Sequence, residues 1–151
     1  MITFNAPDFT QHPPRSPRVK LGGFVHLPRM LDKARAVVSG NLGEFIFPCP
    51  LDQRLFAFTG LKAEEILEEV KKGCSDTEML SWVLANSNPI RQTWEITTWS
   101  DYLSALSAGD IKRHQLFAET IQSLAPARAD IFTYFDRLDL DDYVTYYGNA
   151  K

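Results

Sequence analysis

The chain has 151 residues, of which 44% are hydrophobic and 23% charged, and its formal net charge is −3. This length is typical of one domain with a sizeable core. The composition excludes the disordered class, and no apolar run approaches the roughly 20 residues that span a bilayer, so we expect no membrane partner. Basic residues outnumber acidic ones between residues 9 and 43, but the acidic total argues against nucleic acid as a partner.

The N-terminal residues predict an extended arm. The first 14, MITFNAPDFTQHPP, lack the basic start and apolar core of a secretory signal, so we expect a cytoplasmic protein. Four prolines within residues 1–20 disfavour a regular helix. The arm either lies across the domain, anchored by Phe4 and Phe9, or trails into solvent.

Residues 27–39 predict a helix with two separate faces. Pro28 fits its first turn, and Gly40 fits a left-handed residue at its end. At 100° per residue the apolar side chains share one arc. The opposite arc holds the polar side chains Arg29, Asp32, Lys33, Arg35 and Ser39.

An apolar run and a second helix follow. Phe45, Ile46 and Phe47 are too few for a helix and predict a buried extended segment. Cys49 and the proline after it fit the N-cap and first position of a helix that runs to Thr59.

The next elements are also predicted to be helices. Lys62 is a poor N-cap for a third helix, whereas Ser75 and Glu78 form a capping box before a fourth. A fifth element begins near Asn88, and its apolar residues do not keep to one stripe. It is therefore either deeply buried or broken near Thr97 and Thr98.

The C-terminal third predicts two further helices. Asp110 caps one that ends near Leu124, and another begins near Asp130. The tail, residues 141–151, predicts a loop or a short strand. Together these patterns predict an all-α fold: a single compact domain of six to seven helices over residues 21–151, with the Pro-rich arm at 1–20.

Three charged residues on the first helix form a candidate binding set. Arg29, Asp32 and Arg35 are spaced i, i+3, i+6, so one carboxylate can serve both arginines. They are either a solvated ion-pair face or guanidinium groups that face a groove and bind an anion.

Cys49 and Asp52 form the more specific candidate pair. A thiol at a helix N-terminus is stabilised as a thiolate by the helix dipole, and Arg54 is close in sequence. The alternative is a small buried cysteine with Asp52 in a capping role. Because Asp52 projects between apolar positions, it needs a partner, for which Arg29 or Arg35 is suitable.

The histidines do not predict a metal site, and no motif predicts a cofactor. His26 and His114 fit hydrogen-bonded core or boundary positions, and His12 lies in the arm. No histidine has a ligand partner at i+3 or i+4, and neither a phosphate-binding loop nor a dinucleotide fingerprint is present.

Ordered blocks of the sequence resemble a known family. They are PRSPR at 14–18, LGGFVHLPRMLDKARA at 21–36, the step from Gly43 to Phe45, and CPLDQRLFAFTGL at 49–61. These blocks resemble a bacterial family catalogued as domain of unknown function 5069. The resemblance implies a small, mainly helical cytosolic protein and supplies no activity, substrate or cofactor.

Three hypotheses about function follow. The first is a module that binds a small anionic ligand or a protein in a charged pocket between the helices that start at Pro28 and Pro50. The pocket would be lined by Arg29, Asp32, Arg35, Glu44, Asp52 and Arg54. The second is an enzyme with Cys49 as nucleophile or redox thiol and Asp52, with His26, as proton-handling partners. The third is a structural protein that self-associates, as a homodimer, through Tyr143, Tyr146 and Tyr147.

Overall fold

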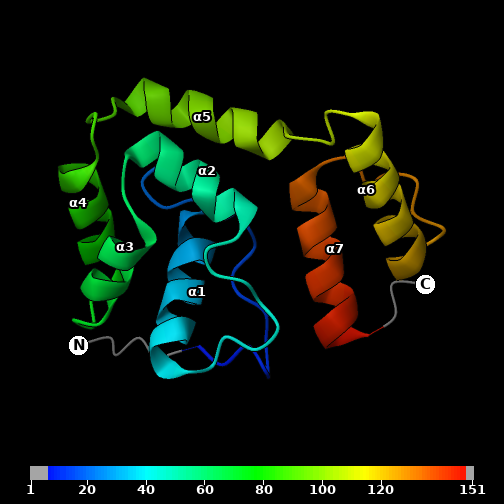
Figure 1. Ribbon diagram of the computed structural model, residues 1–151, viewed down its shortest axis with the longest axis horizontal. Helices are drawn as coiled ribbons and strands as arrows, with labels where there is room; N and C mark the ends of the chain where they lie inside the picture. Colours follow the sequence, from blue (N-terminus) through cyan, green and yellow to red (C-terminus); the bar gives the residue numbers. More distant parts are fainter. Residues whose placement is uncertain (1–6, 149–151) are drawn as a thin grey trace. The chain divides into compact units, whose positions relative to one another are not determined.

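The computed structural model describes residues 7–148, which form seven α-helices and no β-strand (Figure 1). This confirms the all-α prediction. The helices are α1 (Leu27–Ser39), α2 (Pro50–Thr59), α3 (Ala63–Val70), α4 (Asp76–Asn86), α5 (Thr93–Ala105), α6 (Ile111–Leu124) and α7 (Tyr134–Tyr147). Within the described residues, no helix has both the length and the apolar character needed to cross a membrane.

The chain divides into two compact units, Met1–Ser100 and Asp101–Lys151. The predicted single domain over residues 21–151 stays a prediction, because this division does not decide whether the units fold independently.

In the first unit, α1 supplies the centre of the core. Leu27, Met30, Leu31 and Ala34 on its apolar arc are completely or almost completely buried. They pack in one cluster with side chains from α2, α3 and α4, among them Leu55, Ile66 and Met79. The amphipathic pattern therefore identified the buried face of α1 correctly.

Three of the five side chains on the polar arc of α1 are buried as well, which argues against the alternative of a solvated ion-pair face. Arg29 and Lys33 are each 2% exposed and Arg35 is 8% exposed. Part of this cover comes from the N-terminal arm, which packs along the helix instead of trailing into solvent. Phe9 is buried and its N–H donates to the carbonyl of Asn41 at 3.0 Å. Phe4, the other predicted anchor, lies outside the described residues.

The residues predicted to cap the ends of the early helices are confirmed. Gly40 and Gly60 are left-handed at the ends of α1 and α2, and Cys49 is the N-cap of α2. The capping box of Ser75 and Glu78 is formed at the start of α4.

Two predictions in the middle of the chain are wrong. Ile46 is 68% exposed, and Phe45 and Phe47 are only half-buried, so this apolar run is not a buried segment. Helix α5 is neither broken nor deeply buried. Thr97 and Thr98 lie within a continuous helix, where their hydroxyls donate to carbonyls four residues earlier.

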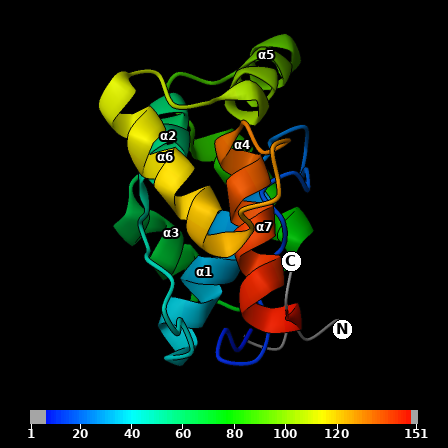
Figure 2. The same ribbon diagram turned by 90° about the vertical axis from the view of Figure 1, so that its right-hand side faces the viewer.

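In the second unit, α6 and α7 lie side by side (Figure 2). Their core contains Phe117, Ile121 and Leu140. Helix α7 begins at Tyr134 rather than near Asp130, because Thr133 and Asp136 form a capping box. It continues to Tyr147, so the prediction of a loop or strand in the tail is wrong for residues 141–147.

Candidate functional site

Four side chains from two neighbouring helices meet in the first unit. His26 immediately precedes α1, and its backbone is left-handed, with φ of 65°. Lys33 lies two turns further along α1. Cys49 and Asp52 are the N-cap and third residue of α2, where the proline at position 50 fixes the start of the helix. We call His26, Lys33, Cys49 and Asp52 the thiol cluster.

Asp52 is the centre of the thiol cluster. Its carboxylate is fully buried. Oδ1 lies 2.7 Å from His26 Nε2, while Oδ2 accepts from Lys33 Nζ at 2.6 Å and from the backbone N–H of Cys49 at 2.8 Å. Three donors therefore compensate a carboxylate that has lost its water. The charged partner among these contacts is Lys33, where the sequence suggested Arg29 or Arg35.

The ammonium of Lys33 also holds the thiol. Nζ lies 3.1 Å from Cys49 Sγ and 3.1 Å from the carbonyl oxygen of Ile46. With Asp52 it has three acceptors for its three hydrogens. Cys49 Sγ accepts a second contact, from the backbone N–H of Asp52 at 3.5 Å, so the sulfur lies at the N-terminus of α2 next to a cation.

The protonation states in the thiol cluster follow from burial and charge. Burial alone raises the pKa of Asp52, but the hydrogen bond from His26 and the charge of Lys33 outweigh it and lower the pKa from 3.8 to about 2. Burial lowers the pKa of His26 below 6.5, against the opposing pull of Asp52. His26 is therefore neutral near pH 7. Because an ionised carboxylate only accepts hydrogen bonds, His26 Nε2 carries the hydrogen and donates it to Asp52.

A second polar cluster joins the arm, α1 and α4. Arg15 contacts Asp32 at 2.9 Å and Asp76 at 2.7 Å, and Arg35 contacts Asp76 at 2.9 Å. Burial raises the pKa of Asp76, but its hydrogen bonds with Arg15 and Arg35 outweigh burial and the net pKa is lowered. Arg29 donates to the carbonyl of Arg15 at 3.2 Å. These contacts, made at residues far apart in sequence, tie the three segments together.

The structure separates the residues that were predicted to line one charged pocket. Asp52 lies in the thiol cluster, Asp32 and Arg35 belong to the second cluster, and Arg29 lies beside them on the polar arc of α1. Glu44 and Arg54 are exposed on the surface.

Sequence reasoning missed Lys33, Arg15 and Asp76 as members of the two clusters. The signal that could have identified them was an excess of cations on one helix, because buried cations need carboxylate partners and these must come from elsewhere in the chain.

Three members of the thiol cluster offer the donor types that zinc prefers. Ligand atoms of His26, Cys49 and Asp52 all lie within 4.8 Å of one another. However, the ammonium of Lys33 is bonded to two of these three residues, at 2.6 and 3.1 Å. The positive charge at this position is therefore supplied by the chain itself.

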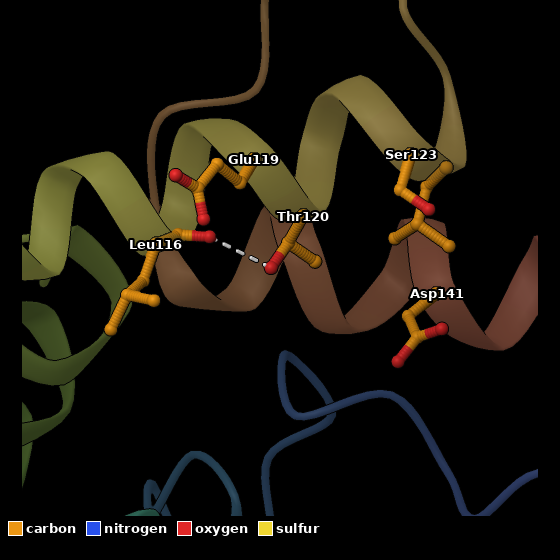
Figure 3. A pocket seen from close by; sticks show the side chains of 6 residues that line it. Leu116, Glu119, Thr120, Ser123 and Asp141 are labelled. Atoms are coloured by element: carbon orange, nitrogen blue, oxygen red, sulfur yellow. Dashed lines mark hydrogen bonds between the residues drawn. The ribbon is translucent and has the colours of Figure 1, made fainter.

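The second unit carries an open groove with a volume of about 390 Å³ (Figure 3). Five of its lining residues come from α6 and one, Asp141, from α7. The hydroxyl of Thr120 is directed back to the carbonyl of Leu116 within its own helix, at 2.9 Å. The lining combines two carboxylates, two hydroxyls and two leucines.

Comparison with known proteins places the chain in a family. Residues 11–144 match the family model described as "Domain of unknown function (DUF5069)". A search of curated proteins gave no match. The matched segment includes both helices that carry the thiol cluster and most of the second unit. The chain therefore belongs to the domain of unknown function 5069 family.

Proposed function

We propose that the protein acts through Cys49, as a nucleophilic thiol that attacks a small electrophilic substrate. One observation carries this proposal: the ammonium of Lys33 lies 3.1 Å from Cys49 Sγ while Asp52 holds the same ammonium at 2.6 Å. Nucleophilic cysteines in proteins typically lie in partly exposed, electropositive surroundings such as this one. The N-terminus of α2 adds positive potential at the same atom.

The cost of burying these groups supports a functional interpretation. His26 and Asp52 are 0% exposed and Lys33 is 2% exposed. A buried ion pair is often no more stabilising than apolar side chains of similar volume, so retention of three ionisable groups around one sulfur calls for another reason. Such groups concentrate at sites where a charge must be stabilised during a reaction.

Each member of the thiol cluster has a defined role in this proposal. Sγ donates an electron pair to an electrophilic carbon, and the leaving group departs with the electrons of its own bond. Lys33 is the only one of the four that both contacts the sulfur and carries protons it can donate, so it protonates the leaving group. Asp52 holds Lys33, and neutral His26 holds Asp52 through its Nε2–H, so both are positioning residues.

Access to the thiol cluster is through Cys49. This residue is half-buried, whereas the other three side chains are buried, so Cys49 is the member that a substrate from solvent can reach. Both cysteines are free thiols. A nucleophilic thiol must stay reduced, which agrees with a cytoplasmic location as part of this proposal.

Competitive alkylation tests the proposal with an internal reference. Cys74 is also half-buried, but burial and the nearby charge of Glu69 raise its pKa, so this thiol reacts slowly. At pH 7 with a limiting amount of iodoacetamide, we expect Cys49 to be modified at least about tenfold faster than Cys74, as measured by peptide mass spectrometry. Equal rates at the two cysteines, or a faster rate at Cys74, would contradict the proposal.

The two other hypotheses stay predictions. For anion binding, a ligand at Arg15 or Arg35 must compete with Asp32 and Asp76. Because Arg29 and Asp52 are buried, alanine at either position cannot separate binding from stability. For self-association, Tyr143 and Tyr147 are 51% and 65% exposed, one turn apart on α7.

A further inference from the structure

The contact between Lys33 and Cys49 places a nitrogen nucleophile beside an oxidisable sulfur. Nζ and Sγ are 3.1 Å apart. Lys33 is almost inaccessible to solvent, whereas Cys49 is half-buried. A small oxidant can therefore reach the sulfur, while the first nucleophile available to the oxidised sulfur belongs to the protein itself.

We propose that a peroxide converts Cys49 and Lys33 into a reversible covalent link, a sulfenamide between Sγ and Nζ, which switches the thiol off. This inference rests on the proposed function, because only a reactive thiolate attacks peroxide efficiently. It names the regulation of the same site and the class of oxidant that acts on it.

The reaction balances with one peroxide. The thiolate attacks one oxygen of hydrogen peroxide, the O–O bond breaks, and the sulfenic acid forms as water leaves. Lys33, having given up one proton to the departing hydroxide, attacks the sulfur through its Nζ lone pair. The S–O bond breaks, the S–N bond forms, and a second water leaves with another proton from Nζ. In total, thiolate, ammonium and hydrogen peroxide give the sulfenamide and two waters, and sulfur is oxidised by two electrons.

Competing fates of the sulfenic acid are disfavoured by the surroundings. The other cysteine, Cys74, has its Sγ against Glu69, at 3.6 Å from the backbone oxygen and 3.8 Å from the carboxylate. Lys33 Nζ already contacts Cys49 Sγ and is held there by Asp52 and Ile46. The lysine therefore needs only a small movement to form the bond, and a low-molecular-weight thiol reverses it by reducing the sulfenamide to thiol and amine.

The link also removes a charge from the interior. A sulfenamide nitrogen is not an ammonium, so Asp52 loses its cationic partner and keeps the hydrogen bonds from His26 and from the Cys49 N–H. We therefore expect oxidation to lower the melting temperature and a reducing thiol to restore it.

Mass spectrometry of the full-length Cys74→Ser protein tests this inference. After treatment with about one equivalent of hydrogen peroxide and digestion without reductant, we expect the peptides that contain Lys33 and Cys49 to be joined, with a combined mass two hydrogens lower. Dithiothreitol should separate them. Cys49→Ser removes the sulfur and should abolish the link.

Lys33→Arg is the matched control, because it keeps a cation and removes the amine. In this variant we expect the sulfenic acid to persist and to be trapped by dimedone. If Cys49 in the protein that keeps Lys33 is trapped by dimedone to the same yield as in Lys33→Arg, with no joined peptide, the inference is overturned. Should Lys33→Arg fail to fold, the protein that keeps Lys33 is sufficient: a joined peptide that dithiothreitol separates supports the inference, and its absence overturns it. Fast alkylation of Cys49 without a link overturns only the switch, whereas slow alkylation overturns the proposed function.

Discussion

At the start of α2, a single ammonium group is bonded to a carboxylate, a thiol and a carbonyl oxygen. Lys33 reaches this position because a lysine carries its charge at the end of a long flexible stem. The stem crosses from α1 to the segment of residues 46–52, so one side chain both balances the charge of Asp52 and fixes the surroundings of Cys49. The chemistry proposed for the thiol depends on this contact.

Stability near neutral pH should depend on His26. Its pKa is lowered by burial, despite Asp52, and Lys33 and Arg29 lower it further. The unfolded chain therefore binds the proton more readily than the folded one. The stability is complete above pH 6.5 and falls as the pH drops below this value. Asp52, with its pKa of about 2 against 3.8, adds a loss only below about pH 4.

We therefore expect the free energy of unfolding, measured with urea, to fall by about 1 kcal/mol between pH 7.5 and 5.5. In His26→Gln, whose amide can still donate to Asp52, this dependence should largely disappear, although the protein is less stable at both pH values. His114→Gln, at an exposed position on α6, is the matched control and should keep the wild-type dependence. A His26→Gln protein with the same pH dependence as wild type would show that another group is responsible.

At the scale of elements, the joint after α2 depends on a glycine. Gly60 has φ of +74°, and a Cβ at this residue would collide with the carbonyl oxygen of Asn88. Gly73, between α3 and α4, has φ of +78° but no atom within 4 Å of the position of a Cβ. The two glycines share the same left-handed backbone and differ in the space around them.

Gly60→Ala should therefore be much more destabilising than Gly73→Ala. We expect Gly73→Ala to cost about 1 kcal/mol, the strain of a left-handed alanine, and Gly60→Ala to cost about 3 kcal/mol because a backbone carbonyl must also move. Urea denaturation of both variants measures the difference. Equal losses of unfolding free energy in the two variants would mean that the backbone carbonyl of Asn88 moves aside at little cost.

The helix ends and the polar arc of α1 show what the sequence could and could not predict. Helix ends at Gly40, Gly60 and Ser75 were predicted correctly because a cap depends on residues within about four positions. For the polar arc of α1 two interpretations stayed open, a solvated face or a groove, because its cover comes from distant segments. Arg15 lies 17 residues before Asp32, and Asp76 lies 41 residues after Arg35. No local pattern contains these pairings.

The candidate site was predicted in part, for the same reason. The proline after Cys49 identified a thiol at a helix N-terminus, and the apolar neighbours of Asp52 indicated that it needs a partner. The sequence could not show which cation would pair with Asp52. Arginine and lysine side chains differ in length, and which of them reaches Asp52 depends on how α1 is rotated against α2.

At the scale of the whole molecule, the net charge of −3 conceals an ionic interior in the first unit. Here Lys33, Arg35 and Arg29 are buried and His26 and Asp52 are fully enclosed. The second unit has an apolar core around Phe117 and Ile121 instead. Among the described residues, the buried ionisable side chains therefore all lie in the first unit, and the proposed function depends on one of them, Lys33.

The most direct test is the alkylation rate of Cys49 with and without the charge of Lys33, in Cys74→Ser protein so that one thiol reports. We expect Lys33→Met to lower the rate constant with iodoacetamide at pH 7 by at least about tenfold. Lys33→Met combined with Asp52→Asn removes both charges of the ion pair and guards against unfolding, because it leaves no unpaired buried charge. It should show the same slow reaction. A rate constant equal to that of the Lys33 protein in either folded variant would contradict the claim that Lys33 activates Cys49.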